Sequence, residues 1–151
     1  MIYKSKNVEM TNNLASKLAK YIKGGDIILL NGDLGAGKTT FVKGFAKALG
    51  VKEAVTSPTF TLLKTYETKD FVIVHVDAYR LDGDTFDELE DYINEENVIF
   101  IEWSSCLASQ EFIENHLSID IKYLSKNQRN YILSAKGERY ETLLKEISLD
   151  D

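Results

Sequence analysis

The chain has 151 residues, of which 44% are hydrophobic and 28% charged, and these values are typical of one globular domain spanning 1–151. Its formal net charge of −6 disfavours direct binding to the phosphate backbones of DNA or RNA, and its single cysteine, Cys106, excludes an internal disulfide. Because the sequence has no signal-peptide pattern and no run approaching the ~18 apolar residues of a membrane span, we expect a cytoplasmic protein without a membrane partner.

The N-terminal part of the chain predicts one extended segment and one helix. Residues 1–6 are expected to extend or to pair at the edge of a sheet. Apolar side chains then recur at helical spacing, at Met10, Leu14 and Leu18 among others. With Asn7 as the N-cap and the pair Gly24-Gly25 as the stop, this pattern predicts a helix that packs one face on the sheet.

A glycine-rich motif directly follows a wholly apolar run. Residues 27–30 read as a buried strand, and Gly32-x4-Gly37-Lys38-Thr39 matches the phosphate-binding P-loop. Glycines let the backbone curl so that successive N–H groups converge on phosphate oxygens, and the following helix adds the positive end of its dipole. In this motif Lys38 reaches the β- and γ-phosphates and the Thr39 hydroxyl binds Mg²⁺. We therefore expect the chain to bind a nucleoside triphosphate.

The rest of the chain predicts a mixed parallel/antiparallel sheet flanked by helices, in one α/β domain. Pro58 makes the stretch around it a stiff loop rather than a helix. The other expected elements are a strand hairpin over 61–67 and 71–77, a short helix over 85–92, a buried strand over 98–101, a second strand pair over 117–123 and 131–135, and a C-terminal helix from about 138.

Two apolar strands end in a carboxylate, Asp77 in one case and Glu102 in the other. Ligands of open α/β sheets lie beyond the carboxyl ends of the strands, so either acid could hold Mg²⁺ or its water shell near Thr39. The sequence leaves open which acid touches the metal. His75, which alternates with valines, is interpreted as a hydrogen-bonded strand residue in preference to a catalytic one. Arg80 is equally suited to a phosphate or to the nearby acids.

Four motifs together resemble the TsaE family, also called YjeE, the bacterial ATPase required for threonylcarbamoyl modification of adenosine in tRNA. They occur in the order and spacing of the family and cover nearly the whole chain. One departure is Ser105, where the family commonly has an acidic residue. The motifs are Gly32-Asp33-Leu34-Gly35-Ala36-Gly37-Lys38-Thr39-Thr40, Ser57-Pro58-Thr59-Phe60-Thr61-Leu62, His75-Val76-Asp77-Ala78-Tyr79-Arg80-Leu81 and Ile101-Glu102-Trp103.

The resemblance implies a P-loop ATPase fold that uses ATP and Mg²⁺. It implies Thr39 and Glu102 as the metal-side ligands, Asp77 as the second acid and the loop containing Thr59 as the switch element. Together with Lys38, the residues Asp77, Glu102 and Thr59 are the candidate catalytic residues. By the same resemblance, the nucleotide-binding residues are Gly32, Asp33, Leu34, Gly35, Ala36, Gly37, Lys38, Thr39 and Thr40.

The resemblance also implies partners. Members of the family work with a TsaD–TsaB heterodimer, in which TsaD transfers the threonylcarbamoyl group. The family member binds that pair and hydrolyses ATP to permit repeated rounds, so it meets tRNA only indirectly, through the complex. The start of the first helix, at Asn7 to Thr11, approaches the adenine in this family.

Two other function classes are compatible with a P-loop. A small-molecule kinase is disfavoured because the chain has only Arg80, Arg129 and Arg139 as arginines and no evident arginine-bearing lid. A non-catalytic, nucleotide-dependent binding module would recruit partners without needing Asp77 or Glu102. A GTPase is disfavoured because no guanine-recognition signature of the Asn-Lys-x-Asp type is present.

Overall fold

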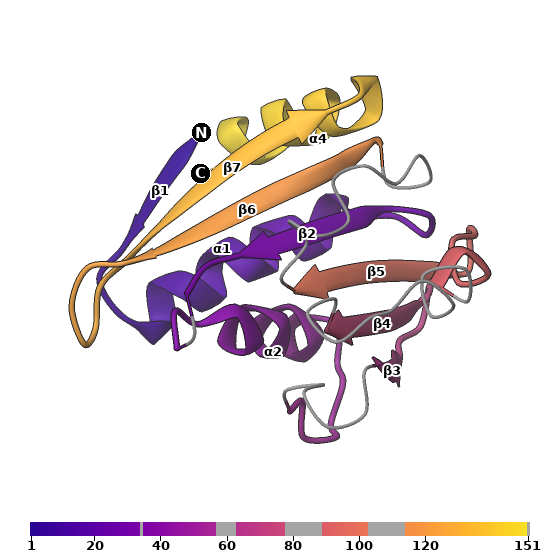
Figure 1. The fold of residues 1–151 in the computed structure, drawn as a ribbon, viewed down its shortest axis with the longest axis horizontal. Coiled ribbons are helices and arrows are strands. Elements are labelled where there is room, and N and C mark those ends of the chain that lie inside the picture. Colours follow the sequence, from indigo (N-terminus) through magenta and orange to yellow (C-terminus); the bar gives the residue numbers. More distant parts are fainter. Residues whose placement is uncertain (34, 57–62, 78–88, 103–113, 151) are drawn as a thin grey trace.

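The computed structural model describes residues 1–33, 35–56, 63–77, 89–102 and 114–150. In these residues seven strands form one sheet, in the order β1-β7-β6-β2-β5-β4-β3 (Figure 1). The strands are β1 (Ile2–Ser5), β2 (Ile27–Asn31), β3 (Leu63–Glu67), β4 (Val72–Asp77), β5 (Asn97–Glu102), β6 (His116–Tyr123) and β7 (Arg129–Lys136). The helices are α1 (Val8–Tyr21), α2 (Lys38–Ala48) and α4 (Glu138–Leu149).

The middle of the sheet is parallel and its margins are antiparallel. Strand β2 pairs in parallel with β5 on one side and β6 on the other, and β4 continues the parallel part beside β5. The pairs β1–β7, β6–β7 and β3–β4 are antiparallel. The arrowheads of β2, β5 and β4 therefore point the same way in Figure 1, toward the start of α2. The predicted α/β fold with a mixed sheet is confirmed.

The apolar run of β2 is explained by burial on both faces of the sheet. Ile28 and Leu30 belong to the larger core, which joins the sheet to α1, α2 and α4. Ile27 and Leu29 belong to a second core on the other face, which includes Leu89. A strand buried on both faces has no polar face, so its sequence shows no alternation.

Helix α1 begins where the sequence predicts. The Asn7 side chain accepts a hydrogen bond from the Met10 N–H at 2.9 Å, which is the expected N-cap interaction. The helix ends at Tyr21, before the glycine pair, because the next residue is extended and the Lys23 N–H donates to Asp26 at 2.7 Å. The cap was predictable from local sequence, whereas the end depends on a side chain further along the chain.

The other predicted elements agree with the structure wherever it describes them. Both strand hairpins form, and residues 1–6 supply an edge strand. The predictions for 57–62, including Thr59, and for most of 78–92, including Arg80, concern residues that the structure does not describe. Among the described residues, no helix is both long enough and apolar enough to cross a membrane.

Candidate functional site

The P-loop lies between the end of β2 and the start of α2. Gly32, Gly35 and Gly37 have φ angles of +155°, +81° and +113°, which residues with a Cβ rarely adopt. At Gly32 a Cβ would also lie 2.9 Å from the Ile121 carbonyl oxygen on β6. Backbone conformation therefore favours glycine at all three positions, and lack of space adds to this at Gly32 alone. Leu34 is outside the described residues.

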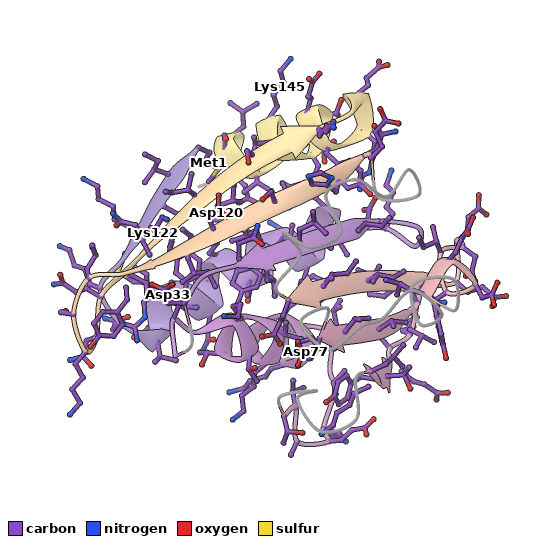
Figure 2. The ribbon with its side chains drawn as sticks, viewed as in Figure 1. Met1, Asp33, Asp77, Asp120, Lys122 and Lys145 are labelled. Carbon is purple, nitrogen blue, oxygen red and sulfur yellow. The ribbon has the colours of Figure 1, made fainter. Side chains whose placement is uncertain are left out.

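Lys38 is the first residue of α2, and its side chain folds back over the loop. Its Nζ donates to the Gly32 carbonyl at 2.7 Å and to the Asp33 carbonyl at 3.1 Å. Burial lowers the pKa of Lys38, while the carboxylates of Glu102, Asp33 and Asp77 act in the opposite direction. The ammonium group is thus held inside the loop, within the field of three acids (Figure 2 labels Asp33 and Asp77).

The two strand-end carboxylates lie side by side. Asp77 on β4 and Glu102 on β5 are register partners in the parallel pair, and each is only 5% exposed. Residues paired in this way share a face of the sheet, and Leu30 of β2 is the partner of Glu102 on its other side. The structure therefore brings both predicted acids to the carboxyl edge of the sheet, on the face that carries α2.

His75 contacts one of these acids. Its Nε2 and the Glu102 Oε2 form a hydrogen bond, and the imidazole is fully buried. An ionised carboxylate can only accept, so beside the ionised form of Glu102 the proton of this bond lies on Nε2. The other ring nitrogen, Nδ1, has no hydrogen-bond partner among the described residues. The interpretation of His75 as a hydrogen-bonded strand residue is correct, but its partner is a predicted site residue.

The donor set fits Mg²⁺ better than a metal that needs a cage of protein ligands. In the described part of the chain, no three His, Cys, Asp or Glu side chains are grouped to hold a metal. Mg²⁺ commonly takes one or two protein oxygens and fills its remaining positions with water and phosphate. Thr39 and Thr40 lie in the first turn of α2, beside the loop, and Glu102 and Asp77 supply the nearby carboxylates.

A small hollow of about 90 Å³ adjoins the P-loop. Three segments far apart in the sequence form it: the start of α1, the loop with the start of α2, and the β6–β7 turn. Its lining residues are Asn7, Val8, Thr11, Ala36, Gly37, Thr40, Lys126, Asn127, Arg129 and Tyr131. No local pattern in the sequence indicates the contribution of Arg129, which reaches the loop from a strand that begins 93 positions after Ala36.

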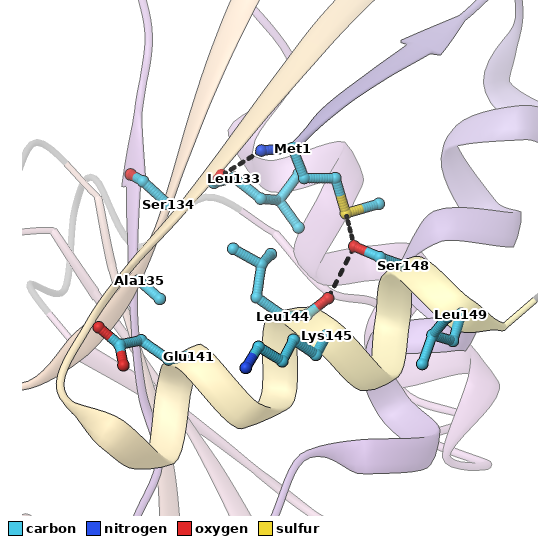
Figure 3. A pocket seen from close by; sticks show the side chains of 9 residues that line it. All are labelled: Met1, Leu133, Ser134, Ala135, Glu141, Leu144, Lys145, Ser148 and Leu149. Atoms are coloured by element: carbon cyan, nitrogen blue, oxygen red, sulfur yellow. Dashed lines mark hydrogen bonds between the residues drawn. The ribbon is translucent and has the colours of Figure 1, made fainter.

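A larger hollow of about 760 Å³ lies between β7 and α4. Figure 3 shows Leu144 of α4 pointing toward Met1 and β7, with the Met1 ammonium group bonded to the Leu133 carbonyl at 3.2 Å. None of its lining residues belongs to the P-loop or to the acidic strand ends. Although this hollow is the larger of the two, it is therefore not the candidate nucleotide site.

Comparisons with known proteins show which sequences this chain resembles. The family model described as "Threonylcarbamoyl adenosine biosynthesis protein TsaE" matches residues 5–131. A protein of Bacillus subtilis named tRNA threonylcarbamoyladenosine biosynthesis protein TsaE is 39% identical over 150 residues, covering 99% of this chain and 94% of its own. A protein of the same name from Aquifex aeolicus is 42% identical over 123 residues, covering 80% and 86%.

A solved structure is also similar. The crystal structure of YdiB from Bacillus subtilis superposes with a TM-score of 0.83 at 36% sequence identity, covering 98% of this chain and 93% of that one. The similarity therefore extends over nearly the whole chain.

Proposed function

Because the chain belongs to the threonylcarbamoyl adenosine biosynthesis protein TsaE family, we propose that it is the accessory ATPase of tRNA threonylcarbamoyladenosine biosynthesis. It binds ATP with Mg²⁺ at the P-loop and hydrolyses it to ADP and phosphate in complex with TsaD and TsaB. The observation that carries this proposal is the position of Lys38 inside the P-loop, within the field of Asp77 and Glu102.

Lys38 and the loop amides hold the phosphates in this proposal. The Lys38 ammonium group exchanges its contacts with the Gly32 and Asp33 carbonyls for β- and γ-phosphate oxygens. The negative charge of a triphosphate compensates the burial that lowers the pKa of Lys38, so binding keeps this side chain protonated. The dipole of α2 favours the same anion.

Thr39 and Glu102 would hold Mg²⁺, which would neutralise part of the phosphate charge. Asp77, buried beside Glu102, is positioned to orient water or to accept a hydrogen bond from the water shell of the metal. Thr59, the proposed γ-phosphate sensor, lies outside the described residues. By the family resemblance, the adenine of ATP would lie near the start of α1, where Asn7 and Thr11 line the small hollow.

Turnover by the chain alone is expected to be slow. Arginines that stabilise the transferred phosphoryl group raise the rates of P-loop enzymes by about 10³–10⁵. Of the two arginines that the structure describes, Arg139 is engaged with Asp26 and Arg129 with backbone carbonyls, so neither is presented to the γ-phosphate; Arg80 lies outside the described residues. A partner that supplies or orders such a group would therefore stimulate hydrolysis.

The test is phosphate release from ATP by the purified chain, alone and then with TsaD and TsaB. We expect a rate of about 10⁻⁴–10⁻² s⁻¹ alone, as for P-loop switch proteins without a supplied arginine, and a clear increase with both partners. Lys38→Ala should abolish ATP binding, and Glu102→Gln should leave binding but remove most hydrolysis and its Mg²⁺ dependence.

Glu67→Gln is the matched control, because Glu67 is an exposed carboxylate at the other end of the sheet. It should behave like the wild type. Equal rates with and without TsaD and TsaB would contradict the coupled ATPase and would direct attention to small-molecule phosphate acceptors. Normal ATP affinity in Lys38→Ala would contradict the P-loop site itself.

A further inference from the structure

Arg129, the first residue of β7, contacts the backbone of the P-loop. Its Nε donates to the Ala36 carbonyl at 2.8 Å. Its Nη1 donates to the Gln128 carbonyl at 2.9 Å and also reaches the Ser125 carbonyl in the β6–β7 turn. The guanidinium carbon lies 4.4 Å from the centre of the Tyr123 ring, a cation–π distance. One side chain thus joins the phosphate loop to a hairpin of the sheet margin.

This contact fixes the direction of one loop amide. In a trans peptide, which is planar, the C=O and the N–H point to opposite sides. The Ala36 carbonyl points outward to Arg129, so the N–H of Gly37 in the same peptide points to the other side, into the loop. Gly37 has a φ of +113° and is the N-cap of α2, where N–H groups bind anions.

We propose that Arg129 is a positioning residue for phosphate binding, which holds the Ala36–Gly37 peptide with its N–H directed at the phosphate. The inference rests on the proposed nucleotide site at the P-loop. The guanidinium group also polarises the peptide to which it is bonded, which makes the Gly37 N–H a stronger donor. Arg129 acts through the backbone and need not touch the nucleotide phosphates.

The β6–β7 hairpin holds the Arg129 side chain in place. Residues 123–128 at its tip are exposed, and they hold the guanidinium group through backbone carbonyls and the Tyr123 ring. Displacement of the tip would move the Arg129 side chain and release the Ala36 carbonyl. The conformation of the hairpin should therefore affect phosphate affinity, although the hairpin lies outside the P-loop motif.

The test compares the affinities of the wild type and Arg129→Lys for ADP and for adenosine by calorimetry. Lysine keeps the positive charge but cannot bond the loop and the turn at once with a planar fork. We expect ADP affinity to fall roughly ten- to a hundredfold, the effect of losing one well-directed hydrogen bond to a charged group, with adenosine affinity unchanged. The Gly37 amide proton should shift downfield on ADP addition in the wild type and less so in the variant.

Lys122→Gln is the matched control, since Lys122 is an exposed cation on the same hairpin (Figure 2). It should bind ADP like the wild type. Tyr123→Leu removes the cation–π contact with Arg129 without changing the P-loop, and it should weaken ADP binding by only about two- to fivefold. This variant tests the inference if Arg129→Lys does not fold.

Three outcomes would overturn the inference. Wild-type ADP affinity in Arg129→Lys would show that charge alone suffices. Equal losses for ADP and adenosine would place the effect in the nucleoside hollow instead. A wild type that binds neither ATP nor ADP would remove the proposed nucleotide site and with it this role of Arg129.

Discussion

His75 is a buried residue whose side chain is hydrogen-bonded to a proposed metal-side acid. Its side chain is 0% exposed on β4, and its Nε2 is hydrogen-bonded to Glu102 on the neighbouring strand. A carboxylate held by a second residue has fewer orientations than a free one, and such outer contacts commonly set the affinity of a metal site. We therefore expect His75 to orient the Glu102 carboxylate toward Thr39 and the loop.

The prediction at this scale concerns His75→Leu. Removal of the imidazole leaves the Glu102 carboxylate buried without this donor, so we expect a loss of about 1–3 kcal/mol in unfolding free energy, measured by urea denaturation. The apparent Mg²⁺ affinity in the presence of ATP should fall roughly 10- to 100-fold. His75→Gln, which keeps a donor of similar reach, should recover part of both. Unchanged Mg²⁺ affinity in a folded His75→Leu protein would confine His75 to a packing role.

At the scale of elements, α4 is tied to the first residues of β2, the strand that leads into the P-loop. The Tyr140 hydroxyl accepts the Ile27 N–H at 2.8 Å, and Arg139 binds Asp26 through two nitrogens at 2.7 and 3.1 Å. These contacts supply partners for polar groups at the start of the strand. The C-terminal helix therefore covers the sheet and also binds polar groups at the start of its central strand, β2.

Tyr140 gives this connection a pH dependence. Burial raises the pKa of Tyr140 to about 12, above the value near 10 expected in the unfolded chain. The unfolded state therefore loses the phenolic proton first as the pH rises. The contribution of Tyr140 is complete below pH 10 and is lost between about pH 10 and 12.

The measurement is the free energy of unfolding of the wild type and Tyr140→Phe between pH 8 and 12. At pH 8 the variant should be less stable by about 1–3 kcal/mol, because the Ile27 N–H loses its acceptor. The difference between the two proteins should shrink as the pH rises through this window, which separates Tyr140 from the other tyrosines and the lysines. A constant difference would show that the Tyr140 hydroxyl titrates alike in both states.

At the scale of the whole molecule, the strand order determines where the P-loop and the two acids lie. The parallel strands β2, β5 and β4 end at one edge, and α1, α2 and α4 all pack on one face of the sheet. The loop, the acids and the start of α1 therefore meet at the same edge and on the same side. A ligand bound there contacts segments that are joined only in the folded chain, so binding should stabilise the fold as a whole.

The corresponding prediction is a thermal shift. ATP with Mg²⁺ at about 100 times its dissociation constant stabilises a folded protein by about 2.7 kcal/mol, if the unfolded chain does not bind it. For a chain of this length, that corresponds to a rise of roughly 5–10 °C in Tm. Lys38→Ala should show no comparable rise at the same concentrations, whereas Glu67→Gln should match the wild type. An equal rise in Lys38→Ala would place the ATP site elsewhere.

The sequence by itself determined the local structure and the central motif. The spacing of Gly32, Gly37 and Lys38 predicted the loop, because only certain residues tolerate its backbone angles and bind phosphate. Asn7 predicted a helix start, and the alternation in 117–123 predicted a strand with one polar face. These features depend on residues close together in the chain, where periodicity and backbone preference act directly. The ends of two apolar strands also indicated Asp77 and Glu102 as candidate acids, either of which could hold Mg²⁺.

Only the tertiary structure decided which distant side chains serve the site. His75 and Glu102 are 27 positions apart, and Arg129 is 93 positions from Ala36, so no local pattern connects them. Their contacts follow from strand order and register, which place β4 beside β5 and bring the start of β7 to the loop. Pairing of this kind is set by the packing of the whole core, because shifting a strand by one residue would turn its buried side chains to the opposite face.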